Sequence, residues 1–146
     1  MQTIAELIKT IESNIEDKKI NNALELLSPF EEYIGEDWQT HFEPGLNEFK
    51  ASVLHKDNHF KLLLIHWNEK SKSGKHGHLE GGGLMRVLNG EINETRFHPD
   101  DAEQTIGEFK YTEGDLCYIH DALGFHVVEN KEQTPAISLH LYCNGV

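Results

Sequence analysis

The chain has 146 residues, enough for one domain with a buried core, and its share of apolar residues, 38%, is typical of a globular protein. The formal net charge of −12 at pH 7 argues against nucleic acid and anionic membranes as partners. Two cysteines without a Cys-x-x-Cys motif exclude a disulfide framework and favour a reducing, cytoplasmic setting. We find neither the pattern of a signal peptide nor an apolar run long enough to span a membrane.

The first helix is predicted from apolar residues that recur at helical spacing between Ile4 and Ile15. Thr3 is its expected N-cap, and Glu6 stands three residues later, where it completes a capping box. Amphipathic helices of this kind are usually packing elements, so we expect this one to cover one flank of a sheet.

A second helix is predicted after Asn21 or Asn22, either of which can cap it. Its expected buried residues are Ala23, Leu24 and Leu27. The stretch 28–31 (Ser-Pro-Phe-Glu) fits either the end of this helix or the start of another with proline at its first position. A short helical segment is expected over 38–42.

From about Lys50 onward the pattern changes to short strands separated by turns. The predicted strands cover 49–54, 59–67, 76–78, 83–88, 91–97, 105–111, 115–119, 125–129 and 136–142. Between two of them, Asn89-Gly90 is a strong signal for a two-residue hairpin turn. Many short strands indicate an all-β sandwich or barrel. We therefore expect residues 1–146 to form one mainly β domain, helical over 1–45 and a β-barrel over 46–146.

His76 and His78 stand two residues apart, and on a strand they project from the same face. Imidazole is the commonest nitrogen ligand of divalent metals, so one strand can supply two ligands in this way. The alternative is that two histidines of a polar loop merely lie close together.

The last predicted strand carries Ser138, His140 and Tyr142 on one face and Leu139 and Leu141 on the other. A polar face that points into a barrel needs either hydrogen-bond partners or a function. The alternative to a function is a Ser-His-Tyr hydrogen-bond chain that only supports the fold.

Two stretches together resemble the cupin family. The first cupin motif is met by His76, His78 and Gly90, with Gly83 where cupins usually have a glutamate. The second is met by Gly114, Asp115, His126 and Asn130. This resemblance implies a cupin-type β-barrel, a jelly-roll sandwich with the N-terminal helices packed on one flank. It also implies a metal held by three histidines: His76, His78 and His126.

Residues 117–130 and 136–142 are similar to the cysteine dioxygenase family within the cupins. This resemblance implies one Fe(II) per chain and O2 as co-substrate, with both oxygen atoms added to the sulfur of a small thiol, most simply L-cysteine to cysteine sulfinate. It implies that Tyr142 acts catalytically beside the iron and contacts the substrate, and that His140 orients Tyr142. A site of three neutral histidines carries no ligand charge, and a thiolate from the substrate would restore negative charge to the iron.

Two positions depart from the family pattern. The family's carboxylate-binding arginine falls at Lys50, which keeps the charge but loses the bidentate fork. Gly83 replaces a cysteine that animal members join covalently to the tyrosine, so that cross-link cannot form here. Cys143 is expected to point to the opposite face of the strand from Tyr142.

Three alternatives to an L-cysteine dioxygenase stay open. The first is a dioxygenase for another small thiol such as 3-mercaptopropionate instead of L-cysteine, because Lys50 replaces the family's arginine. A non-catalytic cupin that binds a metal or small ligand has the same fold, since fold alone does not determine function. A cupin isomerase with Zn(II) or Mn(II) is a further alternative. We expect a small-molecule thiol as partner and a monomer or weak homo-oligomer.

Overall fold

The computed structural model describes residues 1–43, 49–73, 81–120 and 124–144. The described helical segments are α1 (Ile4–Lys18), η1 (Ala23–Leu26), α2 (Leu27–Glu32) and η2 (Asp37–Thr40). The described strands are β1 (Phe49–Lys56), β2 (Phe60–Trp67), β3 (Gly83–Asn89), β4 (Glu91–His98), β5 (Asp101–Thr112), β6 (Leu116–Ile119), β7 (His126–Glu129) and β8 (Ala136–Cys143). No helix in these ranges is long and apolar enough to cross a membrane.

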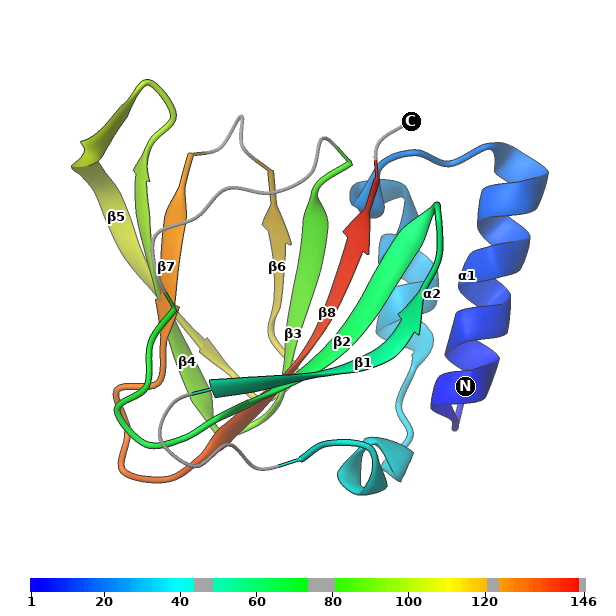
Figure 1. The fold of residues 1–146 in the computed structure, drawn as a ribbon, viewed down its shortest axis with the longest axis horizontal. Coiled ribbons are helices and arrows are strands. Elements are labelled where there is room, and N and C mark those ends of the chain that lie inside the picture. Colours follow the sequence, from blue (N-terminus) through cyan, green and yellow to red (C-terminus); the bar gives the residue numbers. More distant parts are fainter. Residues whose placement is uncertain (44–48, 74–80, 121–123, 145–146) are drawn as a thin grey trace.

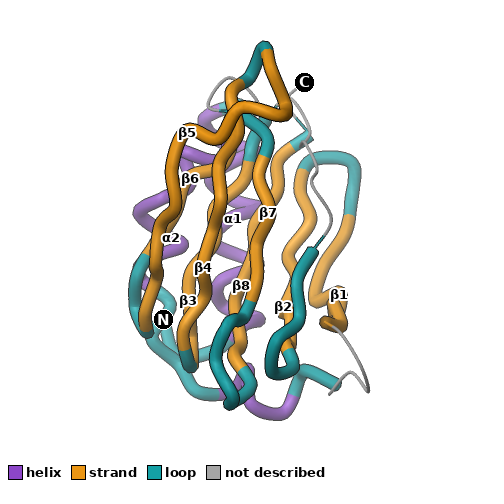
Figure 2. The backbone as a smooth tube through the Cα atoms, turned by 90° about the vertical axis from the view of Figure 1, so that its left-hand side faces the viewer, coloured by secondary structure: helices purple, strands orange, loops and turns teal. Residues whose placement is uncertain are grey.

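The strands form two sheets that face each other, with the helical segments on the far side of the larger one (Figure 1). The larger sheet has the order β1-β2-β8-β3-β6, and the smaller one has the order β5-β4-β7. Figure 2 looks onto the smaller sheet and shows the helices behind the larger one. The predicted β-sandwich with N-terminal helices on one flank is confirmed, as two open sheets rather than one continuous closed barrel.

The central strands β2 and β8 of the larger sheet are buried on both faces, and their alternate residues point to opposite sides. The outer cluster, between this sheet and the helices, includes Leu7, Ile11, Leu26, Phe30, Leu62, Leu64, Leu139, Leu141 and Cys143. The inner cluster, between the two sheets, includes Ile65, Trp67, Met85, Val87, Ile92, Cys117 and Val128. A functional side chain on the inner face of β8 therefore lies between the sheets.

The predicted cap of α1 is confirmed. The Thr3 side chain accepts a hydrogen bond from the backbone nitrogen of Glu6 at 3.1 Å, and its hydroxyl donates to the Glu6 carboxylate. The second helical stretch differs in part from expectation. Asn22 caps it, which is one of the two caps that we predicted. Leu24, which we expected to be buried, is 48% exposed, and Leu26 is buried instead. The reason is that the stretch begins as the 3-10 helix η1, whose period differs from that of an α-helix.

The stretch 28–31 continues this helical run as part of α2, with Pro29 in the first turn, where proline is tolerated. Each predicted strand among the described residues is confirmed, with ends that differ by a few residues: β2, β6 and β7 start one residue later than expected, and β5 starts four residues earlier. The predicted strand 76–78 lies outside the described residues.

The predicted hairpin at Asn89-Gly90 is wrong. β3 pairs with β6 and β8, whereas β4 pairs with β5 and β7, so this turn carries the chain from one sheet to the other. Gly90 has a φ of +80°, but Asn89 does not have a positive φ, and a type I′ hairpin needs one at both residues. Asn89 instead continues the ladder of β3 opposite Ile137 of β8.

Candidate active site

A chain of hydrogen bonds runs along the inner face of β8. Ser138 Oγ lies 2.6 Å from His140 Nε2, and His140 Nδ1 lies 3.1 Å from the hydroxyl of Tyr142. Ser138 and His140 are almost fully buried. The predicted shared face of these three residues is confirmed, because Leu139 and Leu141 belong to the outer cluster.

Trp67 extends this chain from the neighbouring strand. Its indole nitrogen donates to Ser138 Oγ at 2.9 Å, and the side chain is almost fully buried. The indole N–H can only donate, so it sets one end of the chain. The sequence did not reveal this role, because it depends on the pairing of β2 with β8, in which Ile65 lies opposite Ser138.

Tyr142 lies directly opposite Gly83 of β3, and its ring covers the glycine backbone. A Cβ atom at Gly83 would stand only 2.6 Å from Cδ1 of the Tyr142 ring. Burial raises the pKa of the Tyr142 phenol, which therefore stays protonated at neutral pH. Cys143 points to the outer cluster, as predicted.

A second polar group is built around a buried carboxylate on β4. Glu94 is 1% exposed, and its Oε2 accepts a hydrogen bond from Nδ1 of His126 at 2.7 Å. Its Oε1 accepts from Nε of Arg96 at 2.8 Å and from the hydroxyl of Tyr111 at 3.0 Å. Burial alone would raise the pKa of Glu94, but the bonds from His126 and Arg96 lower it to about 2. Glu94 is therefore a fully ionised, buried acceptor.

The pairing of β4 with β7 brings these residues together. Arg96 lies opposite His126 in the register, and Glu94 stands two residues earlier on the same face of β4. Arg96 also donates to Sγ of Cys117 at 3.2 Å and to the backbone oxygen of Tyr118 at 3.1 Å. Sequence reasoning missed Glu94 and Arg96 as site residues. The available signal was an acid and a base at i and i+2 of one strand, facing a predicted interior.

Of the three predicted metal ligands, only His126 belongs to the described residues, and His76 and His78 lie outside them. Within the described ranges, no three His, Cys, Asp or Glu side chains gather to hold a metal ion. The surroundings of His126 fit a metal ligand, because ligating histidines commonly donate one ring N–H to a carboxylate. The bond to Glu94 makes Nδ1 the donor and Nε2 the nitrogen that would meet a metal.

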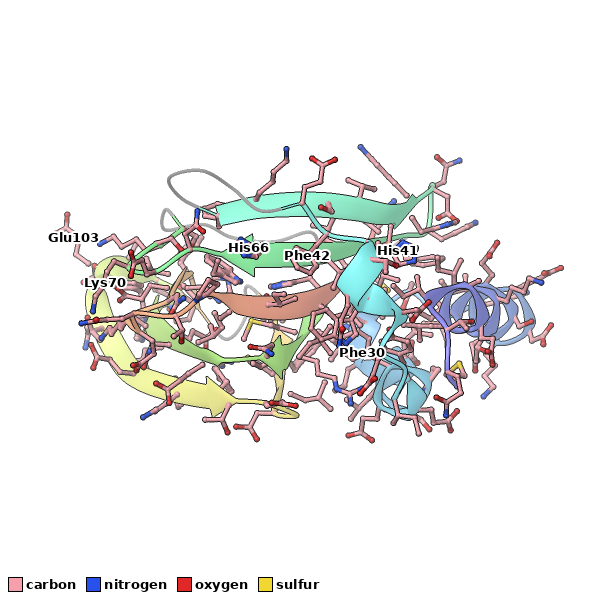
Figure 3. All side chains as sticks on the ribbon, turned by 90° about the horizontal axis from the view of Figure 1, so that it is seen from below. Phe30, His41, Phe42, His66, Lys70 and Glu103 are labelled. Carbon is pink, nitrogen blue, oxygen red and sulfur yellow. The ribbon has the colours of Figure 1, made fainter. Side chains whose placement is uncertain are left out.

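Lys50 does not meet Tyr142 in this structure. It lies opposite His66 in the pairing of β1 with β2, so both side chains belong to the outer face. His66 stacks there on Phe42, with 5.4 Å between ring centroids (Figure 3). The Lys50 ammonium forms an exposed ion pair with Glu43 at 2.9 Å. The resemblance to the family gives the position of Lys50 along the chain, whereas strand pairing determines its face.

Comparison with known proteins gives a family match over nearly the whole chain. Residues 1–145 match the family described as Cysteine dioxygenase type I. Cysteine dioxygenase type 1 of Danio rerio is 31% identical to this chain, over 97% of this chain and 74% of that protein.

Solved structures agree on the fold. A double-stranded β-helix protein from Klebsiella pneumoniae superposes with a TM-score of 0.61 at 18% identity, over 73% of this chain and 86% of that one. A cupin superfamily protein from Desulfitobacterium hafniense superposes with a TM-score of 0.60 at 15% identity, over 75% of this chain and 89% of that one. At such identities the likeness concerns the fold alone, and it is the cupin fold that we expected.

Proposed function

Because the chain belongs to the cysteine dioxygenase type I family, we propose that it is a mononuclear Fe(II) enzyme that adds both atoms of dioxygen to the sulfur of a small thiol. The substrate suggested by the family is L-cysteine, and the product is its sulfinate. The reaction needs no further reductant, because the electrons that leave sulfur reduce dioxygen and both oxygen atoms stay on the product.

His76, His78 and His126 would hold the metal. When bound, Fe(II) supplies the redox chemistry that lets dioxygen react with a thiolate. The support within the described residues is the buried pair of His126 and Glu94, 2.7 Å apart. The carboxylate fixes the orientation of the imidazole ring and makes it a stronger ligand.

Tyr142 would contact the substrate, and His140 would orient Tyr142. The indole N–H of Trp67 can only donate, so it donates to Ser138. The hydrogens along the chain are consistent with every later bond being donated in the same direction, toward Tyr142. Ser138 then donates to Nε2 of His140, and Nδ1–H of His140 donates to the oxygen of Tyr142. The hydroxyl proton of Tyr142 then points away from His140. In this direction it can be donated to the substrate or to oxygen. This buried chain, which ends on a phenol, is the observation that carries the proposal.

The proposal is tested by turnover. The protein is loaded with Fe(II) without oxygen, and L-cysteine, 3-mercaptopropionate or cysteamine is then added with oxygen labelled with the heavy isotope. We expect oxygen uptake to equal sulfinate formation and both labelled atoms to appear in the product. Absence of turnover with every thiol, despite bound iron, would contradict an enzymatic role and favour a non-catalytic cupin.

A further inference from the structure

Lys61 places a positive charge beside Tyr142 on the inner face of the larger sheet. It lies directly opposite Tyr142 in the pairing of β2 with β8, and directly opposite residues share a face. Its ammonium nitrogen stands over the Tyr142 ring, 5.6 Å from the ring centroid. The side chain is half-buried, so its charge is partly shielded from water.

Within the described part of the chain, the Lys61 ammonium has no carboxylate partner, whereas the other cations nearby are already engaged. Lys50 is bound to Glu43 on the outer face, and Arg96 is bound to Glu94. Lys56 of β1 lies directly opposite Lys61, and like charges in this position repel each other. An anion bound between the sheets would relieve this repulsion.

We infer that Lys61 binds the carboxylate of the thiol substrate and so selects thiols that carry one. The inference rests on the proposed function for the identity of the substrate. An anionic substrate needs a local cation in a protein whose net charge is −12. Lys61 supplies it next to the phenol that contacts the same substrate. Its flexible ammonium makes a point contact and not a bidentate fork, so it tolerates carboxylates on chains of different length.

The test compares Lys61→Gln with two matched controls, Lys50→Gln and Lys56→Gln. For each Fe(II)-loaded variant, kcat/KM is measured for L-cysteine, 3-mercaptopropionate and cysteamine, which has no carboxylate. We expect Lys61→Gln to lower kcat/KM for the two carboxylates by roughly 10- to 100-fold, mainly through KM, because a charge-assisted contact is lost. Cysteamine and both controls should change by less than about 3-fold, and Lys61→Arg should restore most of the loss.

Equal losses for all three thiols would overturn the inference and indicate a structural role for Lys61. Loss of carboxylate selectivity in Lys50→Gln instead would assign the carboxylate to the family position. Calorimetric binding of L-cysteine and cysteamine to the Fe(II)-loaded protein without oxygen separates the two proposals. If no variant turns over any thiol, the proposed function fails, while the binding difference between Lys61→Gln and the unchanged chain still decides whether Lys61 holds a carboxylate.

Discussion

Two polar groups lie between the sheets, and they are built in opposite ways. The cluster of Glu94, Arg96 and His126 is charged, and the carboxylate accepts a hydrogen bond on each of its oxygens. The chain from Trp67 to Tyr142 is neutral and linear, and it starts at a group that can only donate. A buried charge is costly unless it is fully paired, whereas a chain of uncharged hydrogen bonds carries no such charge penalty. In the function that we propose, the first group supports the metal and the second donates a proton.

The largest effect is expected from Glu94→Gln, which removes the charge at the centre of the first group. Arg96 is then left without its ionic partner, so the free energy of unfolding of the metal-free protein should fall by about 3 kcal/mol. Fe(II) affinity should fall roughly 10- to 100-fold, because His126 loses its charged acceptor. Urea unfolding and competition with a coloured chelator measure the two effects.

The matched control is Glu91→Gln on the same strand, where the carboxylate pairs with the exposed Lys110. Such surface pairs contribute little to stability, so this variant should keep both its stability and its iron. Unchanged iron affinity in Glu94→Gln would show that the carboxylate does not support the metal, and the division between the two groups would be lost.

A smaller and more selective effect is expected from Tyr142→Phe, which shortens the neutral chain by its last hydroxyl. The ring can still pack on Gly83, so stability should change by only about 1 kcal/mol. Fe(II) affinity should be unchanged, but kcat should fall roughly 10- to 100-fold, because the phenolic proton is gone. Oxygen uptake at saturating thiol measures this loss.

Tyr118→Phe is the control, since its hydroxyl bonds to Asn22 on the helix side of the larger sheet. Full activity in Tyr142→Phe would indicate that the buried chain only supports the fold, which is the alternative that the sequence left open.

The smallest effect is a pH dependence that comes from His66, a buried imidazole on the outer face. Within the described residues, Nδ1 of His66 has no hydrogen-bond partner. By contrast, Nδ1 of His126 is bonded to Glu94 and Nδ1 of His140 to Tyr142. Burial lowers the pKa of His66 in the folded protein, so the unfolded chain binds a proton more readily. Stability is therefore complete above the unfolded pKa of about 6.5 and declines as the pH falls below it.

His66→Phe should flatten this decline between about pH 7.5 and 5.5 and keep the stacking on Phe42. The groups facing His66 on the adjacent strands are Lys50 and Ile137, and neither offers a negative charge to a protonated ring. His59→Gln, at an exposed histidine, is the control and should leave the slope as it is. Thermal unfolding across this pH range measures the difference, and an equal slope in His66→Phe would assign the decline to other groups.

Much of the neutral chain was predictable from the sequence, because alternation along β8 alone puts Ser138, His140 and Tyr142 on one face. The partners Trp67 and Glu94 were not, because a side chain on a neighbouring strand is found only once the register is known. The same limit explains Lys50, whose place along the chain was known but whose face was not. The misassigned hairpin at Asn89-Gly90 has a related cause, since a local turn signal does not say which sheet the next strand joins.

The contact between Gly83 and the Tyr142 ring has a consequence for engineering the protein. A cysteine introduced at Gly83 would bring its Cβ to 2.6 Å from Cδ1 of Tyr142, so the ring would have to shift before the new side chain fitted. Here the tyrosine is positioned by its packing on Gly83 and by its contacts with His140 and Lys61, and it can be exchanged for halogenated analogues that tune its acidity without disturbing a covalent bond.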